Sequence, residues 1–190
     1  MLDNTIYKED VVENYKIVTP EAIEEALKTG KLKQTIFGTG CFWSPDSNFG
    51  GRPGVVQTRV GYAGASTLEP SYRDIKGHAE VVRVVYDSDQ ISYRELLGNF
   101  ESWIVHDRKQ GQYRQILFVF DREQKQVAEE LIQAIGKENA PEVIEVGEQN
   151  GTFWAGEDYH QKYRLRRNKT LVSLAEQEFG SRWDEHLYFT

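Results

Sequence analysis

Cys41 is the single cysteine of this 190-residue chain, and its neighbours favour reactivity. It lies in the segment GTGCFWSPD, between a predicted strand and a predicted short helix. A thiol at a helix N-terminus meets unpaired backbone N–H groups and the positive end of the helix dipole, which lower its pKa and favour the nucleophilic thiolate. Gly38 and Gly40 permit a sharp turn that leaves the sulfur open. A lone cysteine is also often a small buried hydrophobe, so both interpretations stay open.

Further polar groups occur where predicted strands begin or end. In GHAE, His78 and Glu80 are two positions apart on a strand and therefore point to the same side. Tyr62 ends the preceding strand, and a hairpin would bring it near Glu80. The later segment HDRKQGQYR adds three more candidates: His106, Asp107 and Tyr113. Taken singly, each of these side chains is more typical of a structural or surface position.

Two other chemistries find little support. A Cys–His pair suggests a cysteine protease, but the usual protease context of the cysteine is absent and no Asn or Asp is identified to orient His78. Four scattered histidines and one cysteine show no metal-ligand spacing. We therefore expect neither a metal nor a cofactor.

Composition limits the class of protein. The net charge is -7, which argues against a nucleic acid or an anionic membrane as the main partner. No apolar run approaches the length of a membrane span, and the acidic N-terminus lacks the layout of a signal peptide. One cysteine forms no internal disulfide, so a reducing cytoplasm is the expected location.

The predicted elements follow the order β-α-β-β-α-β, which indicates an α+β fold, a two-layer sandwich with a ferredoxin-like core. The strands are expected at 33–38, 55–63, 79–87, 114–120 and 142–147. The helices are expected at 19–30, 41–51, 92 to about 105, 121–139, 157–168 and 171–187. We expect one domain, with an N-terminal arm and helix over 1–32, a catalytic core over 33–163 and a C-terminal helical extension over 164–190.

Local signals support several of these helices. Thr19 is the predicted N-cap of the first, with Pro20 at its first position and Gly30 as its stop. Ser92 and Glu95 form a predicted capping box. The helix over 121–139 carries one apolar face, made of Val127, Leu131, Ile132 and Ile135. Adjacent helical residues do not share a face, so one of Phe42 and Trp43 is expected to point inward and the other toward a site.

Six motifs in order resemble the peptide methionine sulfoxide reductase A family. They run from about Thr35 to Tyr163: GTGCFW, PGVVQTRVGYAG, GHAEVVRVVYD, ISYRELL, HD…QYR and EDYHQKY. GCFW alone is modest support, whereas GCFW followed by VGYAG and GHAE is specific. The resemblance implies an α+β fold and reduction of the S epimer of methionine sulfoxide, free or in proteins, to methionine.

The resemblance also assigns roles. Cys41 would attack the sulfoxide sulfur, and Glu80 would protonate the oxygen, which requires an apolar pocket that raises its pKa. Tyr62 and Tyr113 would hydrogen-bond the oxygen. Phe42 and Trp43 would form the wall that receives the methyl group. Methionine then leaves, and the cysteine becomes a sulfenic acid. The remaining motif residues are Asp107, a substrate-binding candidate, and His78, with a structural or supporting role.

The chain departs from the family pattern in three ways: an altered motif, two shortened segments and the lack of a resolving cysteine. The family pattern is GCFWGxE, and in this chain Ser44, Pro45 and Asp46 occupy its last three positions. Pro45 is tolerable only in a first helical turn. The loop before GHAE is shorter than in many relatives. The segment before Tyr113 is also shorter and lacks an active-site Asp that relatives carry, and whether Asp107 takes that role stays open.

The third departure is that no resolving cysteine follows Cys41. The sulfenic acid therefore needs an external thiol: thioredoxin, a glutaredoxin or glutathione. A basic cluster could steer an acidic reductant, although a solvated helix face is the simpler interpretation; it comprises Arg164, Arg166, Arg167 and Lys169.

Two hypotheses follow. The first is a one-cysteine enzyme, favoured because Cys41, Glu80, Tyr62 and Tyr113 all stand in their motifs. The alternative, motivated by the shortened loops, is a non-catalytic or repurposed homologue that binds oxidised methionine or senses oxidants through Cys41.

Overall fold

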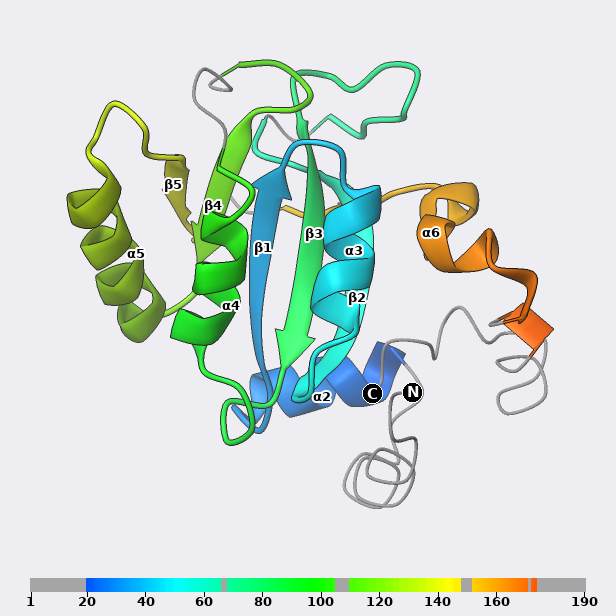
Figure 1. Ribbon diagram of the computed structural model, residues 1–190, viewed down its shortest axis with the longest axis horizontal. Helices are drawn as coiled ribbons and strands as arrows, with labels where there is room; N and C mark the ends of the chain where they lie inside the picture. Colours follow the sequence, from blue (N-terminus) through cyan, green and yellow to red (C-terminus); the bar gives the residue numbers. More distant parts are fainter. Residues whose placement is uncertain (1–19, 66–67, 105–109, 148–151, 171, 174–190) are drawn as a thin grey trace.

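The computed structural model describes residues 20–65, 68–104, 110–147, 152–170 and 172–173. Within these ranges the chain forms a six-stranded sheet in the order β5-β4-β1-β3-β2-β6 (Figure 1). The strands are β1 (Lys33–Thr39), β2 (Val55–Ala63), β3 (Ala79–Tyr86), β4 (Gln115–Val119), β5 (Glu142–Glu145) and β6 (Trp154–Ala155). The helices are α2 (Pro20–Lys28), α3 (Trp43–Gly50), α4 (Tyr93–Glu101), α5 (Arg122–Ile135) and α6 (Tyr163–Arg166), with a 3-10 turn, η1, at Asp158–His160.

The strand pairing confirms the α+β class and the predicted element order from β1 to β4. β1 lies between β3 and β4 and is antiparallel to both. β2 and β3 form an antiparallel pair that places Tyr62 opposite Glu80. β5 adds a parallel edge beside β4, and the short β6, which the sequence did not predict, pairs with β2 at the other edge.

Helices cover the two faces of the sheet unequally (Figure 1). α3, α4 and α5 lie on one face, over a core in which Phe37 stacks on Phe49 and Phe100 at centroid distances of 4.9 and 5.3 Å. Val127 and Leu131 of α5 pack against this core, as their spacing predicts. α2 packs on the other face, where Ile23 joins Leu32 and Val85 in a separate apolar cluster. The described residues therefore form two layers and a partial third.

Several helix ends match their predicted signals. α2 begins at Pro20, and Gly30 adopts a left-handed φ of 73° just beyond its end. The Ser92–Glu95 capping box is formed, with both reciprocal hydrogen bonds present. α4 was predicted to reach about Val105, but it ends at Glu101, because the next N–H groups bond three residues back in tighter turns. Thr19 and Val105 lie outside the described residues.

The predicted helix over 157–168 is wrong. The segment forms the η1 turn, an extended Gln161 and a left-handed Lys162 at φ 54° before α6 begins. Tertiary contacts override helix propensity here, since the Gln161 amide donates to the Val60 carbonyl and the Lys162 ammonium lies 3.3 Å from Asp46. The helix predicted over 171–187 lies almost wholly outside the described residues, and so do the ends of both predicted extensions. No helix among the described residues is long and apolar enough to cross a membrane.

Candidate active site

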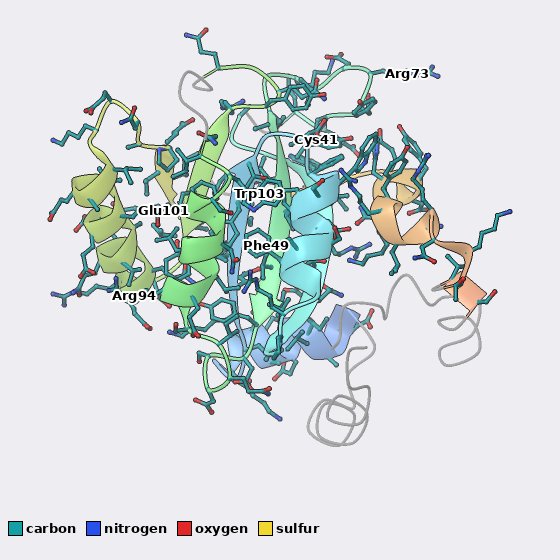
Figure 2. The ribbon with its side chains drawn as sticks, in the orientation of Figure 1. Cys41, Phe49, Arg73, Arg94, Glu101 and Trp103 are labelled. Atoms are coloured by element: carbon teal, nitrogen blue, oxygen red, sulfur yellow. The ribbon has the colours of Figure 1, made fainter. Side chains whose placement is uncertain are left out.

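Cys41 lies at the upper end of the sheet, directly after β1 (Figure 2). Gly40 has a φ of 91°, a conformation open to glycine, and this turn carries the chain from the strand into α3. Gly38 lies so close to β4 that an added Cβ would be 3.2 Å from backbone atoms of Arg114 and Ile116. Cys41 is exposed, so the structural interpretation of a buried thiol is wrong.

The pKa of the Cys41 thiol is raised, which corrects the expectation of a lowered one. Partial burial of the sulfur is the main cause, and the nearby Glu80 charge acts in the same direction. The Trp43 backbone N–H and the Arg164 charge lower the pKa but do not prevail. Cys41 lies two residues before α3, so it faces one N–H donor of the helix rather than occupying its first turn.

Glu80 lies beside Cys41 at the start of β3, with 1% of its surface exposed. Its two carboxylate oxygens accept separate hydrogen bonds, from the Phe42 N–H at 3.1 Å and from the Gln112 amide at 2.5 Å. Burial raises the pKa of Glu80, and these two donors only partly oppose it. A carboxyl group in this environment retains a proton to a higher pH than an exposed glutamate, which is the property expected of a general acid.

Tyr62 lies next to Glu80 on the neighbouring strand, as the predicted hairpin requires. Its hydroxyl donates to the Glu157 carboxylate at 2.7 Å, and the other oxygen of Glu157 accepts from the Tyr72 N–H at 2.9 Å. Burial and the bond to Glu157 hold the pKa of Tyr62 far above its usual range. A sulfoxide oxygen that takes the Tyr62 proton must therefore displace Glu157.

Tyr113 reaches the same end of the sheet from the segment before β4. It is 43% exposed, and its pKa is raised by partial burial and by the charge of Glu80, with Cys41 and Tyr72 also contributing. The shortened preceding segment thus still brings Tyr113 into electrostatic range of Cys41 and Glu80. Asp107 and His106 lie outside the described residues.

Aromatic side chains line the region beside Cys41. Phe42 is buried and packs 6.0 Å from the Tyr62 ring, whereas Trp43 is half-buried and stacks on Tyr163 at 3.8 Å. The pair thus divides as expected, with Phe42 pointing inward. The Trp43 indole N–H donates to Nδ1 of His160 at 3.2 Å, and burial lowers the pKa of that histidine. A neutral His160 therefore anchors the aromatic wall.

His78 is separate from this group. It is buried, and its Nε2 lies 3.1 Å from the Leu68 carbonyl, a contact that holds the loop before β3. None of the described contacts joins it to Cys41 or Glu80. This position agrees with the structural role expected for His78 and with its exclusion as a partner of the thiol.

Three residues at the site were missed as candidates: Gln112, Glu157 and His160. Each falls inside a motif quoted from the sequence, QYR or EDYHQKY. Their occurrence in these motifs was the signal that could have found them. Their hydrogen-bond partners could not be predicted, because those partners are distant in sequence and depend on how the strands and loops pack together.

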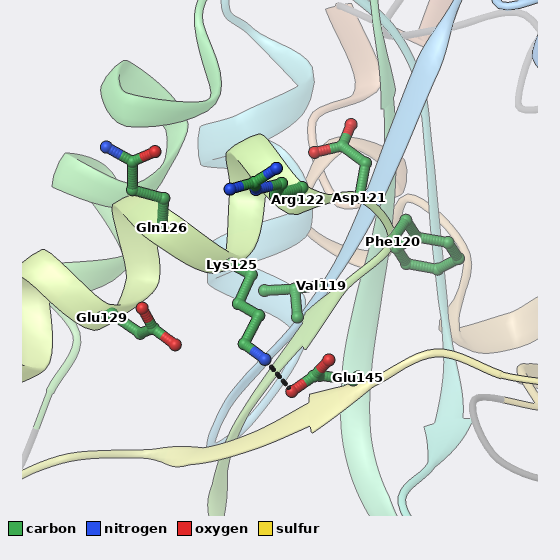
Figure 3. A pocket seen from close by; sticks show the side chains of 8 residues that line it. All are labelled: Val119, Phe120, Asp121, Arg122, Lys125, Gln126, Glu129 and Glu145. Atoms are coloured by element: carbon green, nitrogen blue, oxygen red, sulfur yellow. Dashed lines mark ion pairs between the residues drawn. The ribbon is translucent and has the colours of Figure 1, made fainter.

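An open groove of about 590 Å³ lies elsewhere, between the start of α5 and the end of β5 (Figure 3). Lys125 and Glu145 form an ion pair across it at 2.6 Å. The residues that line this groove carry both positive and negative charges, and the groove lies at the end of β4. Because β1 and β4 are antiparallel, Cys41, which follows β1, lies near the start of β4 instead. It is not part of the Cys41 site. The described residues also contain no cluster of His, Cys, Asp or Glu able to hold a metal ion.

Comparison with known proteins agrees with this geometry. The family model described as peptide methionine sulfoxide reductase matches residues 33–186. This chain belongs to the peptide methionine sulfoxide reductase family. A peptide methionine sulfoxide reductase MsrA of Methanoculleus marisnigri is 42% identical over 153 residues, which cover 72% of this chain and 91% of that protein. The MsrA of Deinococcus radiodurans is 41% identical over 147 residues, covering 69% and 70% of the two chains.

Solved structures of the family share the fold of this reductase. Methionine sulfoxide reductase A of Corynebacterium diphtheriae superposes with a TM-score of 0.58 at 29% identity, covering 73% of this chain and 76% of that one. Mxr1 of Saccharomyces cerevisiae in its reduced form gives 0.58 at 28% identity, covering 74% and 87%. The activity of this reductase is the reduction of methionine sulfoxide to methionine.

Proposed function

We propose that this reductase acts on the S epimer of methionine sulfoxide, free or in proteins, with Cys41 as nucleophile and Glu80 as general acid. The observation that carries the assignment is the junction at the upper end of the sheet. There the residue after Cys41 donates its backbone N–H to Glu80, so thiol and carboxyl are held together. Glu80 has a raised pKa because it is buried.

The first step transfers one oxygen. The Cys41 thiolate attacks the sulfoxide sulfur while Glu80 delivers a proton to the oxygen, on which negative charge grows. Methionine leaves, and Cys41 becomes a sulfenic acid. Tyr113 is poised to hydrogen-bond the oxygen, and Tyr62 joins it once Glu157 releases the Tyr62 hydroxyl. Phe42 and Trp43 supply the apolar contact for the methyl group.

The second step regenerates the thiol. Because Cys41 is the only cysteine, no internal disulfide forms, and the electrons come from an external thiol such as thioredoxin, a glutaredoxin or glutathione. A single thiol that must return to its reduced form fits a reducing compartment, and we place the enzyme in the cytoplasm. The alternative, a protein that binds oxidised methionine or senses oxidants without turnover, gains no support from the geometry.

The test is steady-state formation of methionine from the separate S and R epimers of a blocked methionine sulfoxide, with dithiothreitol in excess. The wild type should turn over the S epimer alone. Cys41→Ser should abolish turnover, and Glu80→Gln should lower kcat by about 100-fold or more, the usual contribution of a general acid. Retained activity in Cys41→Ser would exclude the assigned nucleophile. A folded wild type without turnover would transfer support to the binding or sensing hypothesis.

A further inference from the structure

Arg164 lies beside the active-site helix and is held there by its neighbours. Three consecutive residues of the C-terminal segment contact the first turn of α3. Lys162 pairs with Asp46 at 3.3 Å, Tyr163 stacks on Trp43, and Arg164 donates to Ser44 Oγ at 2.6 Å. An arginine fixed in this way loses less side-chain entropy on binding a ligand than a free surface arginine.

The guanidinium of Arg164 retains unused donors. It has five N–H groups, and Ser44 accepts one of them. Among the described residues no carboxylate forms an ion pair with Arg164, and the side chain is exposed. Ser44 follows Cys41 by three residues, so the cation is placed near the sulfur. Burial is the largest influence on the pKa of Cys41 and raises it, whereas the Arg164 charge acts in the opposite direction, which also indicates proximity.

We propose that Arg164 is a carboxylate-binding residue beside Cys41 and recognises a small thiol reductant that carries a carboxylate, such as glutathione. The proposal rests on the proposed function, because it concerns the step that follows the sulfenic acid. An arginine guanidinium donates two parallel hydrogen bonds to a carboxylate, which gives orientation as well as attraction. The position of Ser44, where the family pattern has glycine, supplies the hydroxyl that holds Arg164 in place.

The chemistry that Arg164 would assist is balanced as follows. The reductant thiolate attacks the Cys41 sulfur, a sulfur–sulfur bond forms, and the sulfur–oxygen bond breaks. The hydroxyl leaves as water with the proton of the reductant thiol. A second thiol then attacks the mixed disulfide, returning Cys41 to a thiol and releasing the reductant as its disulfide. The carboxylate bound by Arg164 positions the first reductant for attack.

The test separates the two steps. Single turnover of wild type, Arg164→Gln and Lys28→Gln with a blocked methionine S-sulfoxide first measures the release of methionine. The sulfenic acid form is then mixed with glutathione or with neutral 2-mercaptoethanol, and mass spectrometry follows the mixed disulfide. Lys28→Gln is the matched control, because it removes the same charge from an exposed residue at the end of α2, before β1, whereas Cys41 follows β1.

We expect Arg164→Gln to slow the reaction with glutathione about fivefold, the order of one exposed ion pair, and to change the 2-mercaptoethanol rate less than twofold. Lys28→Gln should leave both rates close to wild type, and high salt should erase the difference between wild type and Arg164→Gln. Equal slowing with both thiols, or none with either, would overturn the proposal. The single turnover is also measured with free methionine sulfoxide, because the carboxylate of this substrate is the other possible ligand of Arg164.

Arg164→Gln could instead slow methionine release from free methionine sulfoxide and leave release from the blocked substrate unchanged. That result would overturn the proposal that Arg164 binds the reductant and would assign this residue to the substrate carboxylate. Failure of the proposed function has a different signature. In that case the wild type releases no methionine in the single turnover, so no sulfenic acid reaches the second step.

Discussion

Glu80 combines two opposing influences within one side chain. Burial favours its neutral form, whereas the Phe42 N–H and the Gln112 amide are donors that favour the carboxylate. The balance leaves the pKa raised, but by less than burial alone would give. The backbone carbonyl of Gln112 also accepts a hydrogen bond from the Glu80 backbone N–H at 2.9 Å. Gln112 therefore holds both the backbone and the carboxyl group of Glu80.

Gln112→Leu is expected to raise the pKa of Glu80 further, because the substitution removes a donor that stabilises the carboxylate. In the proposed mechanism Glu80 acts while protonated, so the alkaline fall in the rate of methionine formation should move to higher pH. The measurement is the pH profile of kcat/KM for blocked methionine S-sulfoxide. Gln110→Leu, an exposed substitution nearby, serves as the control. A profile that keeps its inflection in Gln112→Leu would show that Gln112 does not influence the acid.

At the scale of elements, the contact between α3 and the segment entering α6 holds the site together. Asp46 and Lys162 are both almost fully buried, and the Lys162 ammonium also donates to the Thr58 hydroxyl at 2.9 Å. Asp46 further accepts from the Thr58 hydroxyl at 2.6 Å. The shorter acid of this chain, in the position where the family has Glu, is thus satisfied by a cation from the motif EDYHQKY.

Lys162→Met is expected to lower the free energy of unfolding by about 3–5 kcal/mol, because it leaves Asp46 buried and unpaired. Urea unfolding measures this change. The double variant Asp46→Leu/Lys162→Met should recover much of the loss, since it removes both buried charges. Lys125→Met, which breaks the exposed pair with Glu145, should cost less than about 1 kcal/mol. A similar loss in Lys125→Met and Lys162→Met would contradict the importance assigned to burial.

At the scale of the whole molecule, the active site works against folding stability. The folded-state pKa of Glu80 is raised above its unfolded value by burial. The stability contributed by its protonated form is therefore complete below the unfolded pKa and is lost as the pH rises through the folded pKa. At neutral pH the buried charge of Glu80 therefore lowers the free energy of unfolding of the wild type, and a neutral side chain of the same size would remove this effect.

Glu80→Gln is accordingly expected to unfold at a higher urea concentration than the wild type at pH 7–8, even though it loses activity. The difference should shrink toward acidic pH, where wild-type Glu80 is protonated in both states. Parallel urea titrations at several pH values measure it, with the exposed substitution Glu69→Gln as the control. A gain of stability in Glu80→Gln that does not vary with pH would indicate a cause other than ionisation.

The sequence by itself determined the element order, the helix-capping signals and the family motifs that contain the candidate site residues. Hydrophobic periodicity and turn residues are local, so the β-α-β-β-α-β order, the Ser92–Glu95 box and the start of α2 at Pro20 could be predicted. The pairing of Tyr62 with Glu80 was also predictable, because a hairpin joins neighbouring strands.

Only the tertiary structure decided the electrostatics and the contacts across long sequence separations. The Cys41 pKa rises because packing partly shields the sulfur from water and brings Glu80 close, and an argument from the local helix dipole includes neither effect. The segment after Glu157 abandons its helix pattern because Gln161 and Lys162 find partners about 100 residues earlier in the chain, on β2 and α3. Local propensities amount to tenths of a kcal/mol per residue, whereas burying a charge without a partner costs several, so the distant partners prevail.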